Sequence, residues 1–279
     1  MNTASPTLHV AAMPFPSYQG TQGAVRSMLE ALHGSGQRPH LLSYASAGYP
    51  YRAPFALHRL TDIPPHRSLR AGPSPAKLAL DARMALHLKR LVRRISAGLI
   101  VAHNVEAAAI ALSARAARVI FFAHTDMENE LPYYRLPLPA FAPRLVGGAL
   151  DRWLARRAAA VATISPLLEQ RFGRLLGDRP RGNGGSLPPP VRYLPLPWPV
   201  PEAVSGPERA LHRCQLGYRP EDIVLLYAGN LDGYQGWESV LDAARVLRAR
   251  RNRLQLLFAT ESDPAPLWQR ARKIGMADR

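Results

Sequence analysis

Short apolar runs alternate with longer amphipathic segments along most of the chain. Apolar runs between polar or glycine-rich stretches are typical of buried parallel strands, and apolar positions three and four residues apart predict helices. The predicted strands are Leu8–Met13, His40–Tyr44, Leu99–Ala102, Val119–Ala123, Val161–Ile164 and Tyr193–Leu196. The predicted helices are Gly23–His33, Ala76–Ile95, Val105–Ala117, Leu145–Ala158 and Pro166–Leu176. Residues 1–197 are therefore expected to form one Rossmann-like α/β domain around a parallel sheet.

Prolines interrupt this pattern at Leu187–Pro190 and again at Leu196–Pro201. Because proline lacks an amide hydrogen, this stretch continues neither a helix nor a central strand, and residues 198–207 are predicted to be a linker. The alternation then resumes with helix Glu208–Leu216, strand Ile223–Ala228, helix Trp237–Arg251, strand Gln255–Ala259 and helix Pro266–Ile274. Two strands are too few for a doubly wound sheet, so residues 208–279 are expected to be an incomplete second Rossmann-like domain.

The chain of 279 residues carries a net charge of +16, and nearly all of its cations are arginines. Three explanations stay open: a coding bias toward arginine, a basic face for an anionic membrane or lipid-phosphate acceptor, and nucleic-acid binding. The even spread along the chain favours the first, and no nucleic-acid partner is predicted. The densest cluster, Lys89–Arg90 with Arg93–Arg94, lies on one predicted helix and is the candidate membrane-facing surface.

Neither a long apolar span nor a signal-like start is found, which predicts a cytoplasmic protein that is peripheral at the membrane if it meets one. The single cysteine, Cys214, excludes an intramolecular disulfide and a cysteine-rich zinc site.

Two strand-to-helix turns carry glycines where a diphosphate could bind. Gly20 and Thr21 follow the first strand, and Gly229 and Asn230, with Gln235 nearby, follow the strand at 223–228. Glycine allows close backbone approach, and the start of a helix carries partial positive charge. A purely steric role for Gly20 is equally compatible, since the G-x-G-x-x-G spacing is not met.

Polar residues also gather after the strand Val119–Ala123, where His124, Asp126 and Glu128 alternate. Open α/β sheets bind ligands at the carboxyl ends of their strands. Three interpretations compete: a metal site, acid–base or sugar-hydroxyl contacts by His124 with a carboxylate, and loop capping.

His103 and Asn104 end the preceding strand, where Asn104 could serve as a helix N-cap. His9 and the remaining histidines show no spacing that suggests a partner and are predicted to be structural or exposed.

Taken in order, these segments resemble glycosyltransferase family 4. The resemblance rests on "MPFPSYQGTQGAVRSMLEALHGSG", "VAHNVEAAAIAL", "VIFFAHTDMENELPYYR", "LDRWLARRAAAVATISPLLEQRF", the proline-rich linker and "IVLLYAGNLDGYQGWESVLDAARVL". It implies the GT-B fold, with an acceptor-side first domain and a nucleotide-sugar-binding second domain. It also implies hexosyl transfer, with retention of configuration, from a nucleotide-diphosphate sugar and without a metal or other cofactor.

The resemblance also implies residue roles. The turn at Gly20 would lie beside the donor phosphates, His124 would contact the donor sugar near the reacting carbon, and the turn at Gly229–Asn230 would meet the diphosphate from the second domain.

Three departures from the family pattern shape what we expect of activity. Thr21 stands where a second glycine is common, and Asn230 and Gln235 stand where Arg and Lys are usual. The two glutamates that hold the donor are absent. We therefore expect a glycosyltransferase that needs a missing C-terminal half, and an acceptor that is lipid-linked or at the membrane surface. The alternative is a catalytically inactive scaffold subunit that pairs with a separate nucleotide-binding half.

Overall fold

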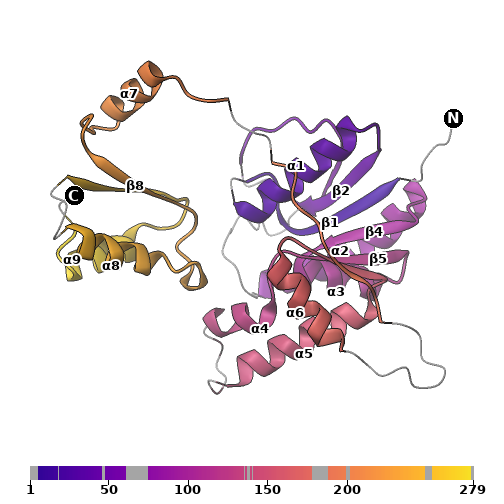
Figure 1. Ribbon diagram of the computed structural model, residues 1–279. Helices are drawn as coiled ribbons and strands as arrows, with labels where there is room; N and C mark the ends of the chain where they lie inside the picture. The colour runs from indigo at the N-terminus through magenta and orange to yellow at the C-terminus, as the bar shows by residue number, and fades with distance from the viewer. Residues whose placement is uncertain are drawn as a thin grey trace. The chain divides into compact units, whose positions relative to one another are not determined.

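The computed structural model divides the chain into two compact units, residues 1–198 and 199–279 (Figure 1). It describes residues 6–17, 19–45, 48–60, 75–134, 136, 139, 141–177, 188–198, 202–248 and 253–277. Residues 199–201 of the predicted linker lie outside these ranges. Within the described residues, no helix combines the length and the apolar character needed to cross a membrane.

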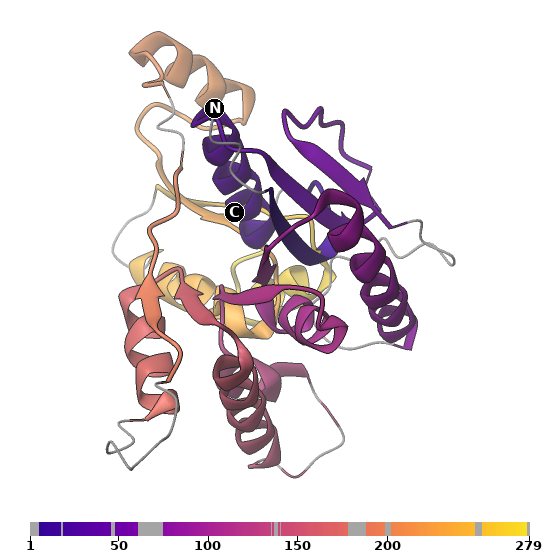
Figure 2. The ribbon, with the colours of Figure 1, turned by 90° about the vertical axis from the view of Figure 1, so that its right-hand side faces the viewer.

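The first unit is built on one parallel sheet of seven strands in the order β3-β2-β1-β4-β5-β6-β7 (Figure 2). The strands are β1 (Thr7–Pro14), β2 (Pro39–Tyr44), β3 (Ala56–Arg59), β4 (Leu99–His103), β5 (Arg118–Ala123), β6 (Ala160–Thr163) and β7 (Val191–Tyr193). The chain winds outward from β1 to β3 and then returns to place β4 beside β1. This reversal is a topological switch point, where doubly wound sheets bind ligands. The predicted parallel α/β class is confirmed.

Helices cover both faces of this sheet. They are α1 (Gly20–Gly34), α2 (Pro75–Ile95), α3 (Asn104–Ala114), the short α4 (Met127–Glu130) with the 3-10 turn η1 (Leu131–Tyr134), α5 (Ala142–Arg157) and α6 (Pro166–Leu176). Helix α6 begins as its sequence predicts, because the Ser165 hydroxyl accepts a hydrogen bond from the Leu168 amide at 3.2 Å and Pro166 follows the cap.

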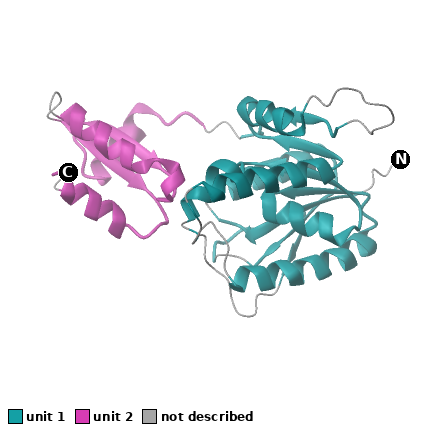
Figure 3. Cartoon of the chain, turned by 90° about the horizontal axis from the view of Figure 1, so that it is seen from below, with its two compact units in different colours: residues 1–198 teal, residues 199–279 magenta. Residues whose placement is uncertain are grey.

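The second unit has a smaller sheet, in which β8 (Ile223–Ala228) pairs in parallel with β9 (Leu254–Ala259) (Figure 3). Its helices are α7 (Gly206–Gln215), α8 (Trp237–Arg248) and α9 (Ala265–Lys273), with the 3-10 turn η2 (Gly233–Gln235) before α8. A capping box formed by Ser205 and Glu208 begins α7. The core consists of Ala244, Leu254, Ala271 and Met276.

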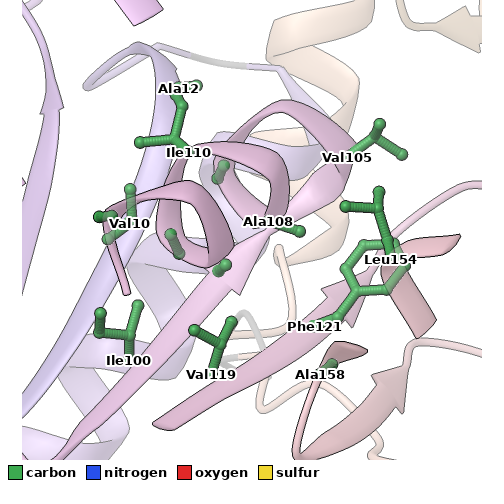
Figure 4. Close-up of a cluster of buried hydrophobic side chains, with 14 of the residues drawn as sticks. Val10, Ala12, Ile100, Val105, Ala108, Ile110, Val119, Phe121, Leu154 and Ala158 are labelled. Carbon is green, nitrogen blue, oxygen red and sulfur yellow. The ribbon is translucent and has the colours of Figure 1, made fainter. Parts of the chain in front are cut away.

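Alternation along the strands divides the core of the first unit between the two faces of the sheet. Val10 joins the large cluster shared with α2, α3, α5 and α6, to which Phe121 and Leu154 also belong (Figure 4). Ala11, the next residue of β1, joins the cluster that packs against α1. This period of two follows from the pleat and places two helical layers around one sheet.

Several element boundaries differ from the predicted ones by up to three residues. Three further differences have a physical reason. Strand β3 is a short edge strand with no sustained apolar run. Helix α4 has four residues, too few to give a periodic signal. Strand β7 begins two residues before the predicted strand at Tyr193–Leu196, because only Val191–Tyr193 pair with β6.

Close packing of α5 against α4 depends on Gly147. A Cβ atom at this position would lie 2.2 Å from the Met127 carbonyl oxygen and 2.7 Å from the Glu128 amide nitrogen. Both contacts involve backbone, which cannot move aside as a flexible side chain can. Only glycine therefore fits here, which explains one member of the Gly147–Gly148 pair inside a helix.

The Gly147→Ala variant is expected to lose about 1–3 kcal/mol of unfolding free energy, because the added methyl group overpacks this contact. Gly173→Ala is the matched control, since it lies inside α6 and its Cβ would meet no atom within 4 Å. The control is expected to be neutral or to gain up to about 1 kcal/mol from helix propensity. Urea denaturation followed by circular dichroism measures both, and equal effects would contradict this account of the α4–α5 contact.

Candidate functional site

Three histidines form a hydrogen-bonded row across β1, β4 and β5. Nδ1 of His9 lies 3.0 Å from Nε2 of His103, and Nδ1 of His103 lies 3.0 Å from Nε2 of His124. Their exposed fractions are 2%, 1% and 5%. The structure thus brings together two predicted site residues, His103 and His124, and adds His9. Sequence spacing suggested no partner for His9, which was predicted to be structural or exposed; the pairing of β1 with β4 gives it one.

Burial keeps this histidine row uncharged. It lowers the pKa of His9 to about 3 and that of His124 to about 4, and it lowers the pKa of His103 well below the ordinary value of 6.5. Within the described part of the chain, no carboxylate pairs with any of the three rings, and Phe122 packs against His103 and His124. Each ring is therefore a neutral imidazole, with one nitrogen donor and one nitrogen acceptor.

Asn104 ties the loop after β5 to the turn after β4. Its side-chain oxygen accepts a hydrogen bond from the His124 backbone amide at 3.2 Å. Its φ of 68° is in the left-handed region, which asparagine tolerates better than most residues. The N-cap position of α3 is held by His103, so the alternative that Asn104 caps this helix was wrong. Asn104 instead fixes the backbone at His124.

Asp126 and Glu128 belong to an ion-pair cluster around Arg171. The Arg171 guanidinium lies 3.2 Å from Asp126, 2.8 Å from Glu128 and 3.5 Å from Asp151. Asp126 also caps α4, accepting a hydrogen bond from the Asn129 amide at 2.9 Å. These contacts favour the loop-capping interpretation, in which both carboxylates hold α4 against α6. Their predicted part in catalysis stays a prediction.

Asp151 supports the same loop from α5. Its fully buried carboxylate accepts hydrogen bonds from the backbone amides of Met127 at 3.0 Å and Glu128 at 3.3 Å. Burial raises its pKa to about 6, although these hydrogen bonds oppose the shift. Neither Asp151 nor Arg171 was predicted to be a site residue. Asp151 could have been found in the sequence, because an acidic residue at a core-facing position of α5 needs a partner. Nothing in the sequence distinguished Arg171 from the other arginines.

The start of α1 lies at the same edge of the sheet as the histidine row, because β1, β4 and β5 are parallel. Gln19, at the N-cap position, makes no side-chain cap hydrogen bond, and the first turn contains no acidic residue. A Cβ atom on Gly20 would meet nothing within 4 Å, so packing alone does not require glycine there. Gly20 and Thr21 thus begin a helix whose positive end carries no opposing charge.

The predicted turn in the second unit is held by internal hydrogen bonds. The Tyr227 hydroxyl donates to the Asn230 carbonyl oxygen at 2.6 Å, and the Leu231 amide donates to Ser262 Oγ at 2.9 Å. Gly229 follows β8, and Gln235 ends η2. Glu238 lies in the first turn of α8, where its negative charge offsets the partial positive charge of the helix N-terminus. This turn is therefore less favourable to an anion than the start of α1.

No metal site is apparent in the part of the chain that the structure describes. No group of three or more His, Cys, Asp or Glu side chains there is arranged to hold a metal ion. The three rings of the histidine row bond to one another in sequence and do not converge on one point.

The sequence and the fold have known counterparts. The family profile described as "Glycosyl transferase 4-like domain" matches residues 19–184, more than half of the chain. Sucrose-phosphate synthase from Thermosynechococcus elongatus has a TM-score of 0.70 and 17% identity, over 99% of this chain and 69% of that chain. WaaG, a glycosyltransferase involved in lipopolysaccharide biosynthesis, has a TM-score of 0.65 and 14% identity, over 98% and 68%.

A third similar structure has a bound nucleotide sugar. It is described as trehalose-6-phosphate from E. coli bound with UDP-2-fluoro glucose, and it has a TM-score of 0.57 and 13% identity, over 99% of this chain and 71% of that chain. At these identities the structures establish the shared GT-B fold. A search among curated proteins gave no match.

The His124 ring is expected to stay neutral in the folded chain until the pH falls to about 4. Histidines of the unfolded chain gain their protons near pH 6.5, so the unfolded state binds more protons between these values. The contribution of His124 to the free energy of unfolding therefore decreases as the pH falls from about 6.5 toward 4, and His9 acts with the same sign. Histidine NMR titration checks this, and a His124 midpoint near 6.5 would contradict the burial of the row.

Proposed function

The chain belongs to the glycosyl transferase 4-like family, and from that premise we propose that it transfers a hexosyl group from a nucleotide-diphosphate donor to an acceptor, with retention of configuration. The observation that carries the proposal is the buried, neutral histidine row at the topological switch point of the sheet. Burying polar rings costs free energy unless their nitrogen atoms form hydrogen bonds. Its outer member, His124, follows β5 directly, where a ligand of this fold class binds.

His124 is assigned the contact with the donor sugar. A neutral imidazole can exchange a hydrogen bond with a sugar hydroxyl without the cost of desolvating a charge. In this proposal His103 and Asn104 act through His124, since the first bonds its ring and the second bonds its backbone amide. The uncapped start of α1, at Gly20 and Thr21, contacts the donor diphosphate.

In this proposal the turn at Gly229 and Asn230, together with Gln235, binds donor phosphates. No cation lies at this turn's own sequence positions, and Glu238 adds negative charge in the first turn of α8. This turn is therefore expected to contribute little to donor affinity. The missing cation is the observation that favours the second candidate function, an inactive binding subunit. Sugar transfer by the chain separates the two candidates.

The proposal includes no metal cofactor. Asp126 and Glu128, the acidic pair that would hold a cation beside a diphosphate, are both engaged in ion pairs with Arg171. Charge on the leaving diphosphate would instead meet the helix start at Gly20. A transfer rate that EDTA abolishes and Mg²⁺ restores would contradict this part of the proposal.

The acceptor is proposed to be anionic and presented at a membrane surface. Four arginines of α5 are among the residues that line a hollow of about 610 Å³, together with Leu145 and Trp153. The Arg157 guanidinium lies 4.6 Å from the centre of the Trp153 ring. Leu145 is 67% exposed and Trp153 is 40% exposed. Exposed apolar side chains among arginines suit a surface of anionic headgroups. The arginines are Arg144, Arg152, Arg156 and Arg157.

Replacing His124 by Ala is expected to lower kcat by about 100-fold or more and to change the KM for the donor far less, because the contact matters most where charge develops at the reacting carbon. His33→Ala, at an exposed position at the end of α1, is the matched control and should be unchanged. Release of nucleoside diphosphate from UDP-, ADP- and GDP-hexoses, with a lipid extract as acceptor, measures both.

The outcomes of this assay separate the candidates. Equal losses in kcat and in donor affinity would assign His124 a positioning role. Donor binding without transfer would favour the inactive subunit. Transfer by this chain alone would contradict the expectation that a C-terminal half is missing, whereas the absence of both binding and transfer with all of these donors would contradict transfer by this chain alone.

For the membrane proposal, Arg152→Gln with Arg156→Gln is expected to weaken binding to phosphatidylglycerol vesicles by about tenfold or more, at roughly 1 kcal/mol per cation. Arg90→Gln with Arg93→Gln on α2 is the matched control, because it removes the same charge from the cluster that the sequence favoured. Co-sedimentation measures both pairs. If only the α2 double variant lost vesicle binding, the membrane-binding surface would lie on α2, which would contradict its assignment to α5.

A further inference from the structure

The histidine row has one closed end and one open end. At the closed end, Nε2 of His9 is fully buried and has no hydrogen-bond partner in the described part of the chain. At the open end, His124 is the first residue after β5, and its Nδ1 makes no hydrogen bond to any described residue. The two contacts between these ends both join an Nδ1 to an Nε2, each at 3.0 Å.

This pattern allows only two arrangements of hydrogens. A neutral imidazole carries one N–H, on either Nδ1 or Nε2. A hydrogen bond between Nδ1 of one ring and Nε2 of the next forms only when both rings carry their hydrogen on the same type of nitrogen. Any mixture sets two hydrogens or two lone pairs against each other at 3.0 Å. All three rings must therefore share one tautomer.

The closed end selects between the two arrangements. With every hydrogen on Nε2, the His9 N–H is buried without an acceptor. With every hydrogen on Nδ1, His9 donates to His103, His103 donates to His124, and only a ring lone pair is left at the closed end. The N–H without an acceptor is then on His124 Nδ1, which, unlike His9 Nε2, is not among the fully buried unpartnered atoms of the described residues. Unsatisfied buried donors are rarer in native proteins than unsatisfied acceptors. The arrangement with hydrogens on Nδ1 is favoured.

We propose that His9 is a positioning residue that sets the tautomer of His124 through His103, so that His124 presents an Nδ1–H donor to the ligand. The proposal deepens the proposed function, because it makes His124 a hydrogen-bond donor to a sugar oxygen and not a base. The low pKa of all three rings agrees with it, since protonation of any member would break the row. The sequence around His9 does not indicate this role, because its partner His103 lies 94 residues away.

The test is the tautomer itself, read from ¹⁵N chemical shifts of the histidine rings in the purified chain of 279 residues at neutral pH. A nitrogen that carries hydrogen and one that does not differ widely in shift, and single-histidine variants assign the signals. In the wild type, His124 is expected to carry its hydrogen on Nδ1. A hydrogen on Nε2 of His124 would overturn the proposal, whether or not the chain transfers sugar.

Two variants of similar size separate positioning from packing. His9→Asn keeps an amide N–H near the place of Nδ1 and should preserve the His124 tautomer. His9→Gln moves the amide away from His103 and should leave a mixture of both tautomers. Circular dichroism confirms that each variant is folded. An unchanged His124 tautomer in a folded His9→Gln variant would overturn the proposal.

Kinetics provide the second readout for the same pair. In a preparation that transfers sugar, His9→Gln is expected to lower kcat by about tenfold or more with little change in the donor KM, and His9→Asn should recover most of the loss. Equal losses in both variants would contradict a role through the tautomer. Because the ¹⁵N shifts need no turnover, a failure of the proposed function would remain distinguishable from a failure of this inference.

Discussion

The parallel pairing of β1 with β4, and of β4 with β5, is the constraint on which the rest of the first unit depends. It brings the carboxyl ends of strands from distant parts of the sequence to one edge, at the point where the winding direction reverses. His9 and His103, 94 residues apart, become hydrogen-bonded neighbours through it. The same pairing puts the uncapped start of α1 at this edge, beside the residues assigned to the sugar.

Burial disfavours charge in both groups of ionisable residues near this edge, but only the carboxylates have a cation as partner. The histidine row has no carboxylate partner among the described residues, so desolvation leaves the rings neutral and turns them into a chain of donors and acceptors. Asp126, Glu128 and Asp151 share Arg171, and their charges hold α4 between α5 and α6. One group therefore supplies directed hydrogen bonds, and the other supplies a rigid support for the loop that carries His124.

The two glycine turns differ in electrostatics although their sequences look alike. The start of α1 has no acidic residue in its first turn, whereas Glu238 occupies the first turn of α8. The turn at Asn230 is also closed by the Tyr227 hydroxyl and by Ser262. The start of α1 is thus more favourable to an anion than the turn of the second unit, and the first unit is assigned the larger share of the proposed chemistry.

The sequence by itself determined the α/β class and most helices and strands, and it pointed to His103 and His124 as candidate site residues, because alternation, capping and strand ends are local signals. It missed β3 and α4, which are too short for periodicity. It also left His9, Asp151 and Arg171 unassigned, since Arg171 meets Glu128 across 43 residues and His9 meets His103 across 94. Only the tertiary structure decided these contacts, because hydrogen bonds and ion pairs between distant segments depend on strand register and helix packing, which no local pattern encodes.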